Sequence, residues 1–220
     1  MNRGNQRIQQ MTILAMLAAL AYIVMVVGRI PVVLFLKYDP KDVVIAISGL
    51  LYGPLSAMSV SLVVSLVEML TVSDTGFIGM VMNFLSSATF SCTAALLYCR
   101  RRTLKNAVIG LVAGCLLTTA VMILWNYLIT PLYMGYPREA VAAMLVPYFL
   151  PFNLLKYGLN AAITLLLYKP LVTGLRRAHL LPESTGGQAR GGRINLAVTL
   201  GAALALVTLV LLGLVFMGIL

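Results

Sequence analysis

Long apolar stretches separated by short charged ones make up most of the chain. A helix needs about 20 mostly apolar residues to cross the hydrocarbon core of a bilayer. Five stretches meet this requirement: residues 11–28, 75–99, 106–130, 141–168 and 196–220. The only charged residue within them is Lys156. The pattern predicts an all-α integral membrane protein.

A sixth apolar stretch, residues 43–67, carries Gly53 and Pro54 in its middle. Proline lacks a backbone N–H and pushes the residue before it out of the helical region, so this pair favours two helices with a break between them. The basic residues support the same choice. If the N-terminus is cytoplasmic, two helices place the basic run 100–105 on the cytoplasmic side, as the positive-inside rule requires, whereas one helix places it outside.

The first helix of this pair, at about 41–52, is too short to cross a hydrocarbon core of about 30 Å at about 1.5 Å per residue. The segment before it, PVVLFLKYD (residues 31–39), must then dip into the membrane or cover a feature on its outer face. Non-helical backbone at that depth is tolerated only where protein buries it or where it lines a cavity. We therefore expect a binding site capped by this segment.

Composition narrows the class of function. Of the 220 residues, 61% are hydrophobic and 10% are charged, and the net charge is +10. Basic proteins often bind nucleic acid, but here the charges lie between apolar spans, where they orient a membrane protein, so nucleic acid is not an expected partner. The three cysteines lie inside apolar segments without a CxxC motif, which indicates small buried side chains without disulfides or metal.

Catalytic and nucleotide-binding motifs are absent from the sequence. The single histidine, His179, lies in a basic polar segment, so a histidine metal site or a Ser/His pair within the membrane is excluded. No P-loop motif occurs, so this chain does not itself bind a nucleotide in that way. We expect no enzyme, no catalytic residue, no metal and no cofactor. Uphill transport would need energy from an ion or from another subunit.

A polar stripe interrupts the stretch at 141–168. On a helix, Asn153, Lys156 and Asn160 lie on one face because residues three and four apart are neighbours. A lysine at the centre of a membrane helix costs about 2.5–3.5 kcal/mol on insertion scales. Lys156 must therefore snorkel to the surface, pair with an acid, or bind a ligand.

Other polar and small residues within the apolar stretches have two interpretations each. Asn83 and Asn126 either form helix–helix hydrogen bonds or contact a ligand, since a buried amide needs a partner. Ala15 and Ala19 form a small-xxx-small pair, which allows another helix to approach closely, although alanine is also common in membrane helices.

Five motifs, in this order, resemble the substrate-binding (S) component of energy-coupling factor (ECF) vitamin transporters, specifically its riboflavin-specific member: FLKYDPKDV, GLLYGPLSA, MNFLSS, WNYLITPLY and LPFNLLKYGLNAAIT. The similarity covers roughly residues 8–175. It implies a six-helix membrane fold, which agrees with the helix count from charge. It also implies riboflavin as the transported ligand, and a transmembrane coupling subunit and ATPase subunits as partners.

In that family the vitamin binds near the outer face, between the loop after the first helix and the outer ends of helices four to six. The resemblance therefore implies ligand contacts at six positions: Leu36, Tyr38, Asn83, Asn126, Asn153 and Lys156. It further implies that Ala15 and Ala19 contact the coupling subunit. We transfer no contact to Ser61, Ser65 or Glu68 in the third helix, where the chain departs from the family pattern.

These observations divide the chain into a six-helix vitamin-binding membrane domain (1–175), a basic cytoplasmic linker (176–193) and an additional transmembrane helix (194–220). We expect a multi-pass protein of the bacterial cell membrane with a cytoplasmic N-terminus. Residues 196–220 contain no Asn, Lys or acid, so we expect this helix to pack peripherally without affecting specificity. Two alternatives remain open: an S component for another vitamin or precursor, and a self-sufficient ion-coupled transporter.

Overall fold

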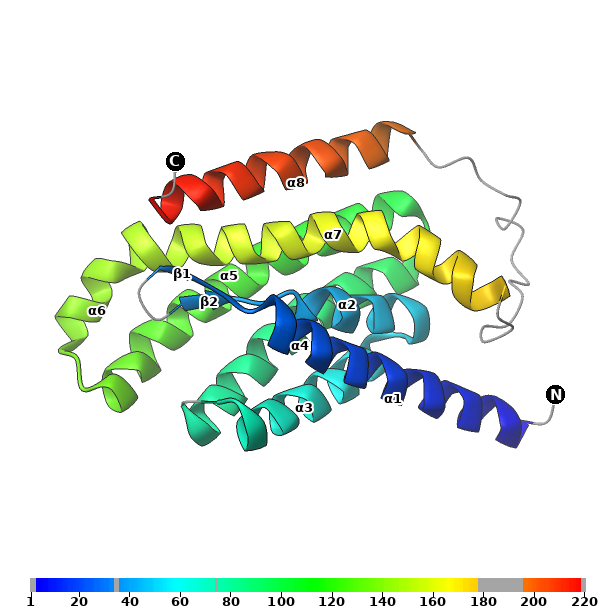
Figure 1. Cartoon of the computed structure of the whole chain (residues 1–220), viewed down its shortest axis with the longest axis horizontal. Coiled ribbons are helices and arrows are strands. Elements are labelled where there is room, and N and C mark those ends of the chain that lie inside the picture. Colours follow the sequence, from blue (N-terminus) through cyan, green and yellow to red (C-terminus); the bar gives the residue numbers. More distant parts are fainter. Residues whose placement is uncertain (1–2, 34–35, 74, 178–195, 219–220) are drawn as a thin grey trace.

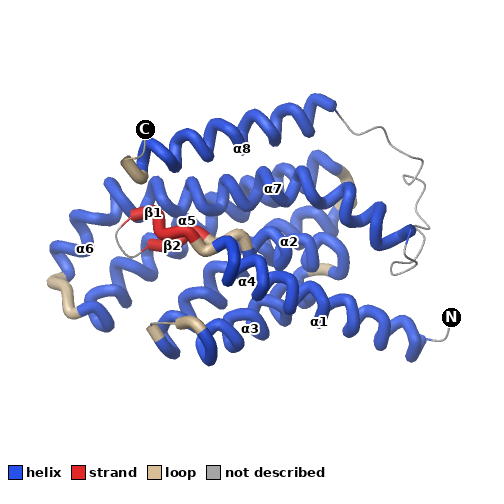
Figure 2. The backbone as a smooth tube through the Cα atoms, in the orientation of Figure 1, coloured by secondary structure: helices blue, strands red, loops and turns tan. Residues whose placement is uncertain are grey.

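The computed structural model describes residues 3–33, 36–73, 75–177 and 196–218, and most of them are helical (Figure 1, Figure 2). The elements follow in this order: α1 (Arg3–Gly28), β1 (Ile30–Val33), β2 (Leu36–Tyr38), α2 (Lys41–Tyr52), α3 (Pro54–Thr71), α4 (Gly76–Arg100), α5 (Leu104–Met134), α6 (Arg138–Met144), the π-helical turn η1 (Leu145–Phe149), α7 (Leu150–Arg177) and α8 (Leu196–Phe216). The two strands pair as an antiparallel hairpin. The predicted linker, apart from its first two residues, lies outside the described residues.

Six helical segments within the described part of the chain are long and apolar enough to cross a membrane. They are α1, α3, α4, α5, the continuous segment from α6 to α7, and α8. Helix α2 has 12 residues and is not among them. The predicted class, an all-α membrane bundle with one extra C-terminal helix, is confirmed.

The predicted break between α2 and α3 lies at Gly53. Its φ of 98° and ψ of 175° place it in a region that glycine adopts without the penalty that a Cβ imposes. Pro54 then occupies the first turn of α3, where a missing N–H costs no intrahelical hydrogen bond. The prediction of two helices is therefore confirmed.

Helix α2 forms the centre of the bundle. It packs against α1, α3, α4 and α7, and every residue from Lys41 to Leu50 is buried. A helix buried on all sides is apolar all round, which explains the uninterrupted hydrophobic pattern. Its two charged residues, Lys41 and Asp42, lie in the first turn and are each 0% exposed, so protein groups must compensate their charges.

The basic run 100–105 lies at one end of the bundle. Figure 1 shows the N-terminal end of α1, the C-terminal end of α7 and the start of α8 at one end, with the α4–α5 connection that carries the basic run 100–105. The hairpin lies toward the other end (Figure 1). This distribution is the one that the positive-inside rule requires of a chain whose N-terminus is cytoplasmic.

Helices α4 and α5 approach closely along two glycines of α5. A Cβ atom at Gly110 would lie 2.7 Å from the carbonyl oxygen of Ala94, and one at Gly114 would lie 2.8 Å from that of Phe90. Glycines four residues apart permit such close backbone packing between membrane helices. The sequence analysis considered a small-residue pair only in the first helix, so it missed this contact.

The end of α5 differs from the sequence prediction. We expected the helix to stop near residue 130, whereas α5 continues to Met134 with Pro131 inside it. One internal proline removes a single backbone hydrogen bond, which a long helix can absorb when its neighbours pack well. The helix ends at Gly135, whose φ of 70° gives the left-handed geometry of a common helix C-cap.

Helix α8 lies at the edge of the bundle against α7 (Figure 1). A Cβ atom at Gly158 of α7 would lie 3.1 Å from Leu209 Cδ1, and one at Gly213 of α8 would lie 3.3 Å from Leu155 Cδ2. Each leucine therefore rests on a glycine of the opposite helix. Because α8 also contacts β1, it supports the flank of the bundle that carries α7 and the hairpin.

Candidate functional site

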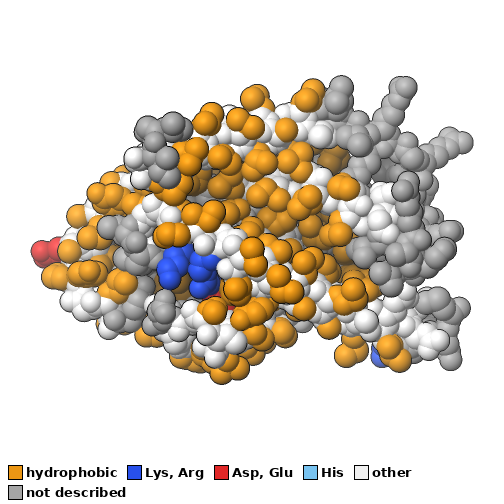
Figure 3. Space-filling view, in the orientation of Figure 1, with side chains coloured by type: hydrophobic (Ala, Val, Ile, Leu, Met, Phe, Trp, Pro, Cys, Tyr) orange, Lys and Arg blue, Asp and Glu red, His pale blue; other side chains and the backbone are white. Residues whose placement is uncertain are grey.

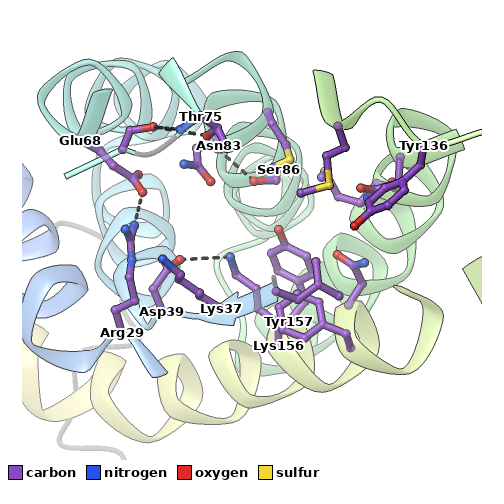
Figure 4. Close-up of a pocket in the computed structure, with 18 residues that line it drawn as sticks. Arg29, Lys37, Asp39, Glu68, Thr75, Asn83, Ser86, Tyr136, Lys156 and Tyr157 are labelled. Atoms are coloured by element: carbon purple, nitrogen blue, oxygen red, sulfur yellow. Dashed lines mark hydrogen bonds and ion pairs between the residues drawn. The ribbon is translucent and has the colours of Figure 1, made fainter. Parts of the chain in front are cut away.

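A cavity of about 660 Å³ lies between the hairpin and helices α3, α4, α5 and α7. This volume falls within the range of small-molecule binding sites. Figure 4 shows Arg29 and Glu68 at one end of the cavity and Tyr136 at the other, with Lys156 and Tyr157 between them. In the space-filling view, the face is mostly hydrophobic, and Lys and Arg side chains gather beside the hairpin (Figure 3).

Apolar side chains form much of the cavity wall. Met82, Met122 and Phe152 contribute thioether and aromatic surface from three different helices. Tyr157 is 1% exposed, and its ring packs against Phe90 with 5.3 Å between the ring centroids. The wall can therefore accept a flat, largely apolar ligand.

The π-helical turn η1 positions Asn153 in the cavity wall. Pro147 and Pro151 cannot donate backbone hydrogen bonds, and the chain widens into a π-helical turn between α6 and α7. Asn153 donates from Nδ2 to the carbonyl oxygen of Phe149 at 2.7 Å. This bond fixes the amide and uses only one of its two N–H donors, so the amide retains capacity for a ligand.

Two further asparagines line the cavity, one from α5 and one from α4. Asn126 is 3% exposed, donates from Nδ2 to Met122 O at 2.7 Å and accepts from Thr130 Oγ1 at 2.9 Å. Asn83 lies in the wall that α4 contributes. The three amides thus come from three helices and converge on one cavity.

Lys156 is both paired and part of the cavity wall. Its Nζ lies 3.3 Å from Asp39 Oδ2 and 3.9 Å from Asp42 Oδ2. The residue is only 7% exposed, so it does not snorkel to the surface. Of the alternatives left open by the sequence, pairing with an acid is the one observed, and its position still allows contact with a ligand.

The pairs at Lys156 belong to a larger buried network of charges. Glu68 accepts from Arg29 Nη2 and from Lys41 Nζ, the latter at 2.6 Å. Lys41 Nζ also lies 4.0 Å from Asp39 Oδ1. The formal charges of the network sum to zero, because it contains three basic and three acidic residues: Arg29, Lys41, Lys156, Asp39, Asp42 and Glu68. Arg29 is partly exposed, and such balance makes burial of the other five charges tolerable.

The end of the hairpin is fixed to α7. Tyr38 donates from its hydroxyl to Asn160 Oδ1 at 3.0 Å, and Asn160 Nδ2 lies 3.4 Å from Asp42 Oδ2. Burial raises the pKa of Tyr38, so its hydroxyl remains protonated and able to donate. Burial alone would raise the pKa of Asp39, but the ammonium of Lys156, followed by Lys41 and Arg29, outweighs it and lowers that pKa. Asp39 is therefore ionised at neutral pH.

The structure places five of the six residues expected to bind ligand in the cavity wall. Those residues are Leu36, Asn83, Asn126, Asn153 and Lys156. The sixth, Tyr38, is not part of the wall and contacts Asn160 behind it. Ala15 and Ala19, the expected partner contacts, are exposed residues of α1 and do not line the cavity.

The sequence analysis missed the acidic and basic residues that line the cavity beside Lys156. Arg29, Lys37, Asp39 and Glu68 all belong to the wall. A usable signal was present, because a buried lysine needs a carboxylate and the whole chain has only six acids. No group of three His, Cys, Asp or Glu residues suitable for a metal occurs among the described residues. The arrangement is that of a binding cavity.

Comparisons with known proteins agree with this geometry. Residues 9–168 match the family described as the ECF transporter, substrate-specific component. The chain is 28% identical to "Riboflavin transporter RibU" of Staphylococcus aureus (strain TCH60) over 78% of its length and 95% of that relative. It is 25% identical to "Riboflavin transporter FmnP" of Bacillus subtilis (strain 168) over 79% of its length and 99% of that relative.

A solved structure gives the same assignment. The chain superimposes with a TM-score of 0.65 and 28% identity on a structure titled "Structure and mechanism of the S component of a bacterial ECF transporter", which covers 80% of this chain and 100% of the solved one. Sequence, helix arrangement and cavity therefore lead to one conclusion: this chain belongs to the family of substrate-specific components of ECF transporters.

Proposed function

We propose that this chain is the riboflavin-binding S component of an ECF-type vitamin transporter. The observation that carries the proposal is the convergence of Asn126, Asn153 and Lys156, from two helices, on one cavity with apolar walls. Riboflavin has a flat, mainly apolar three-ring system with an amide-rich edge and a hydroxylated chain. Amides and one ammonium complement that edge, and thioether and aromatic groups complement the ring faces.

We assign the ring edge to Asn126, Asn153 and Lys156, with Asn83 and Leu36 completing the wall. Tyr38 then contributes indirectly, because its hydrogen bond to Asn160 holds the hairpin end that carries Leu36. Arg29 and Asp39 line the cavity beside the hairpin. Two of their buried atoms, Arg29 Nε and Asp39 Oδ1, have no hydrogen-bond partner among the described residues. A hydroxyl can accept from the first and donate to the second, so we assign the hydroxylated chain to this end.

The sequence contains no P-loop, so energy for uphill transport comes from an ion or from another subunit. We propose that a transmembrane coupling subunit and ATPase subunits supply the energy, and that the coupling subunit contacts Ala15 and Ala19 on α1. Both alanines are exposed on the helix face that turns away from the buried Ile13 and Leu17. Membership of the ECF family does not favour the alternative of a self-sufficient ion-coupled transporter.

Riboflavin titration of the purified protein tests the proposed function. Flavin fluorescence is expected to be quenched saturably, with one ligand bound per chain, because the cavity stacks aromatic and thioether groups on the ring. Thiamine and biotin, which lack the three-ring system, are expected not to compete. If riboflavin fails to bind and another vitamin saturates the site, the alternative of a different specificity on the same fold is correct.

Removal of α8 is expected to leave riboflavin affinity unchanged and to lower thermal stability. No described residue of α8 lines the cavity, whereas truncation after residue 182 removes the leucine–glycine contacts with α7. Titration and thermal unfolding of the truncated protein measure both effects. A substantial loss of affinity would instead show that the packing of α8 against α7 shapes the site.

A reporter at the C-terminus is expected on the outer side, and a cytoplasmic reporter would contradict the proposed orientation.

A further inference from the structure

Glu68 is a residue of the cavity wall, and both of its carboxylate oxygens accept hydrogen bonds from cations. Its side chain is 3% exposed, and it is the carboxylate that α3 contributes to the network. Oε1 accepts from Arg29 Nη2, and Oε2 accepts from Lys41 Nζ at 2.6 Å (Figure 4 shows the pair with Arg29). Because each oxygen already accepts from a charged donor, Glu68 is poorly placed to be a main acceptor for ligand.

The two partners of Glu68 lie at opposite ends of the hairpin connection. Arg29 follows the last residue of α1 and precedes β1, and Lys41 begins α2 shortly after β2. One carboxylate on α3 therefore ties both ends of the connection to the same point. The pairs of Glu68 thus fix where the hairpin leaves and re-enters the bundle.

The hairpin depends on such contacts for its position. Its strands have four and three residues, and an isolated two-stranded hairpin is at best marginally stable. On the opposite side, Asp39 and Tyr38 tie it to Lys156 and Asn160 of α7. The hairpin supplies Leu36 and Lys37 to the cavity wall, so displacing it would open the cavity.

We propose that Glu68 is a positioning residue that holds the hairpin against the cavity and thereby slows release of the ligand. It acts through Arg29 and Lys41. The use of riboflavin as the probe rests on the proposed function, whereas the tethering of the hairpin does not. Replacing Glu68 by glutamine leaves three cations and two carboxylates in the network and weakens both tethers, since charged hydrogen bonds are about twice as strong as neutral ones.

Two measurements on Glu68→Gln test the proposal. Backbone hydrogen exchange of residues 30–33 and 36–38, measured without ligand, is expected to accelerate on the order of tenfold, as is the dissociation rate of riboflavin. The association rate should change less, because the groups assigned to the ring edge are untouched. Glu139→Gln, at an exposed carboxylate of α6, is the matched control and should behave as the unmodified protein does.

A double variant separates tethering from charge balance. Arg29→Gln combined with Glu68→Gln leaves two cations and two carboxylates, so it is expected to fold even if the single variant does not. Hairpin exchange should remain fast in it. Exchange restored to the original rate would overturn the proposal, as would acceleration spread evenly over all helices. If the unmodified protein does not bind riboflavin, the proposed function fails, and the exchange measurement still decides the role of Glu68.

Discussion

Replacing Lys156 by methionine is expected to weaken riboflavin binding by roughly 10- to 100-fold. The substitution keeps the length of the side chain and removes the charged donor that we assign to the ring edge, and a hydrogen bond to a charged group contributes about 1.5–3 kcal/mol. It also leaves Asp39 and Asp42 without their shared cation, which is expected to destabilise the fold by about 3–5 kcal/mol. Fluorescence titration and thermal unfolding measure the two effects separately.

A second variant distinguishes loss of the ligand contact from loss of stability. Asp42 is fully buried and does not line the cavity. Lys156→Met combined with Asp42→Asn leaves Arg29 and Lys41 balanced by Asp39 and Glu68. We expect this double variant to recover stability while binding remains weak. Recovery of full affinity in the double variant would show that Lys156 serves the fold and not the ligand.

Asn153 provides a parallel measurement in the same helix. Asn153→Ala is expected to reduce affinity with little effect on folding, because the change removes no charge. Asn106→Ala is a matched control, since Asn106 bonds to Leu97 O at the opposite end of the bundle. Unchanged affinity in both Asn153→Ala and Lys156→Met would contradict the assigned site.

Tryptophan at Ala15 or Ala19 is expected to abolish transport and co-purification of the coupling subunit while leaving riboflavin affinity unchanged. Both alanines are exposed and do not line the cavity. Close helix packing in membranes depends on small residues, so a large ring at either position would keep the partner helix at a distance. Affinity purification of the complex and a vitamin uptake assay measure the result.

The control for this prediction is Val207→Trp, at an exposed position of α8. It adds the same ring to another lipid-accessible helix and should leave assembly intact. If the alanine variants lose riboflavin binding and still assemble, then α1 supports the cavity and the coupling subunit contacts another face.

The helices and the α2–α3 break could be predicted from the sequence because their causes are local. A stretch long and apolar enough to cross the bilayer is helical wherever it lies in the bundle, since lipid offers no partner for an exposed backbone N–H or C=O. The break depends only on Gly53 and Pro54. The end of α5 was predicted less well, because a single proline disfavours a helix locally and neighbouring helices can override that preference.

The wall of the candidate site was predicted in part. Asn126, Asn153 and Lys156 stand out because polar groups within apolar helices need partners. The sequence cannot say which partner each one has. Lys156 pairs with Asp39, 117 residues earlier, and Tyr38 bonds to Asn160, 122 residues later. Both contacts depend on the hairpin entering the bundle beside α7.

The sequence by itself determined the membrane class, the long apolar helices, the short second helix and the amides that a ligand could meet. These features follow from the free-energy cost of exposing backbone polar groups or charges to lipid. That cost applies to each segment separately, whatever its neighbours are. Only the tertiary structure decided that Glu68 ties Arg29 to Lys41, that three cations balance three carboxylates beneath one cavity, and that α8 rests on Gly158. A buried charge requires a counter-charge, but packing of distant segments chooses which residue supplies it.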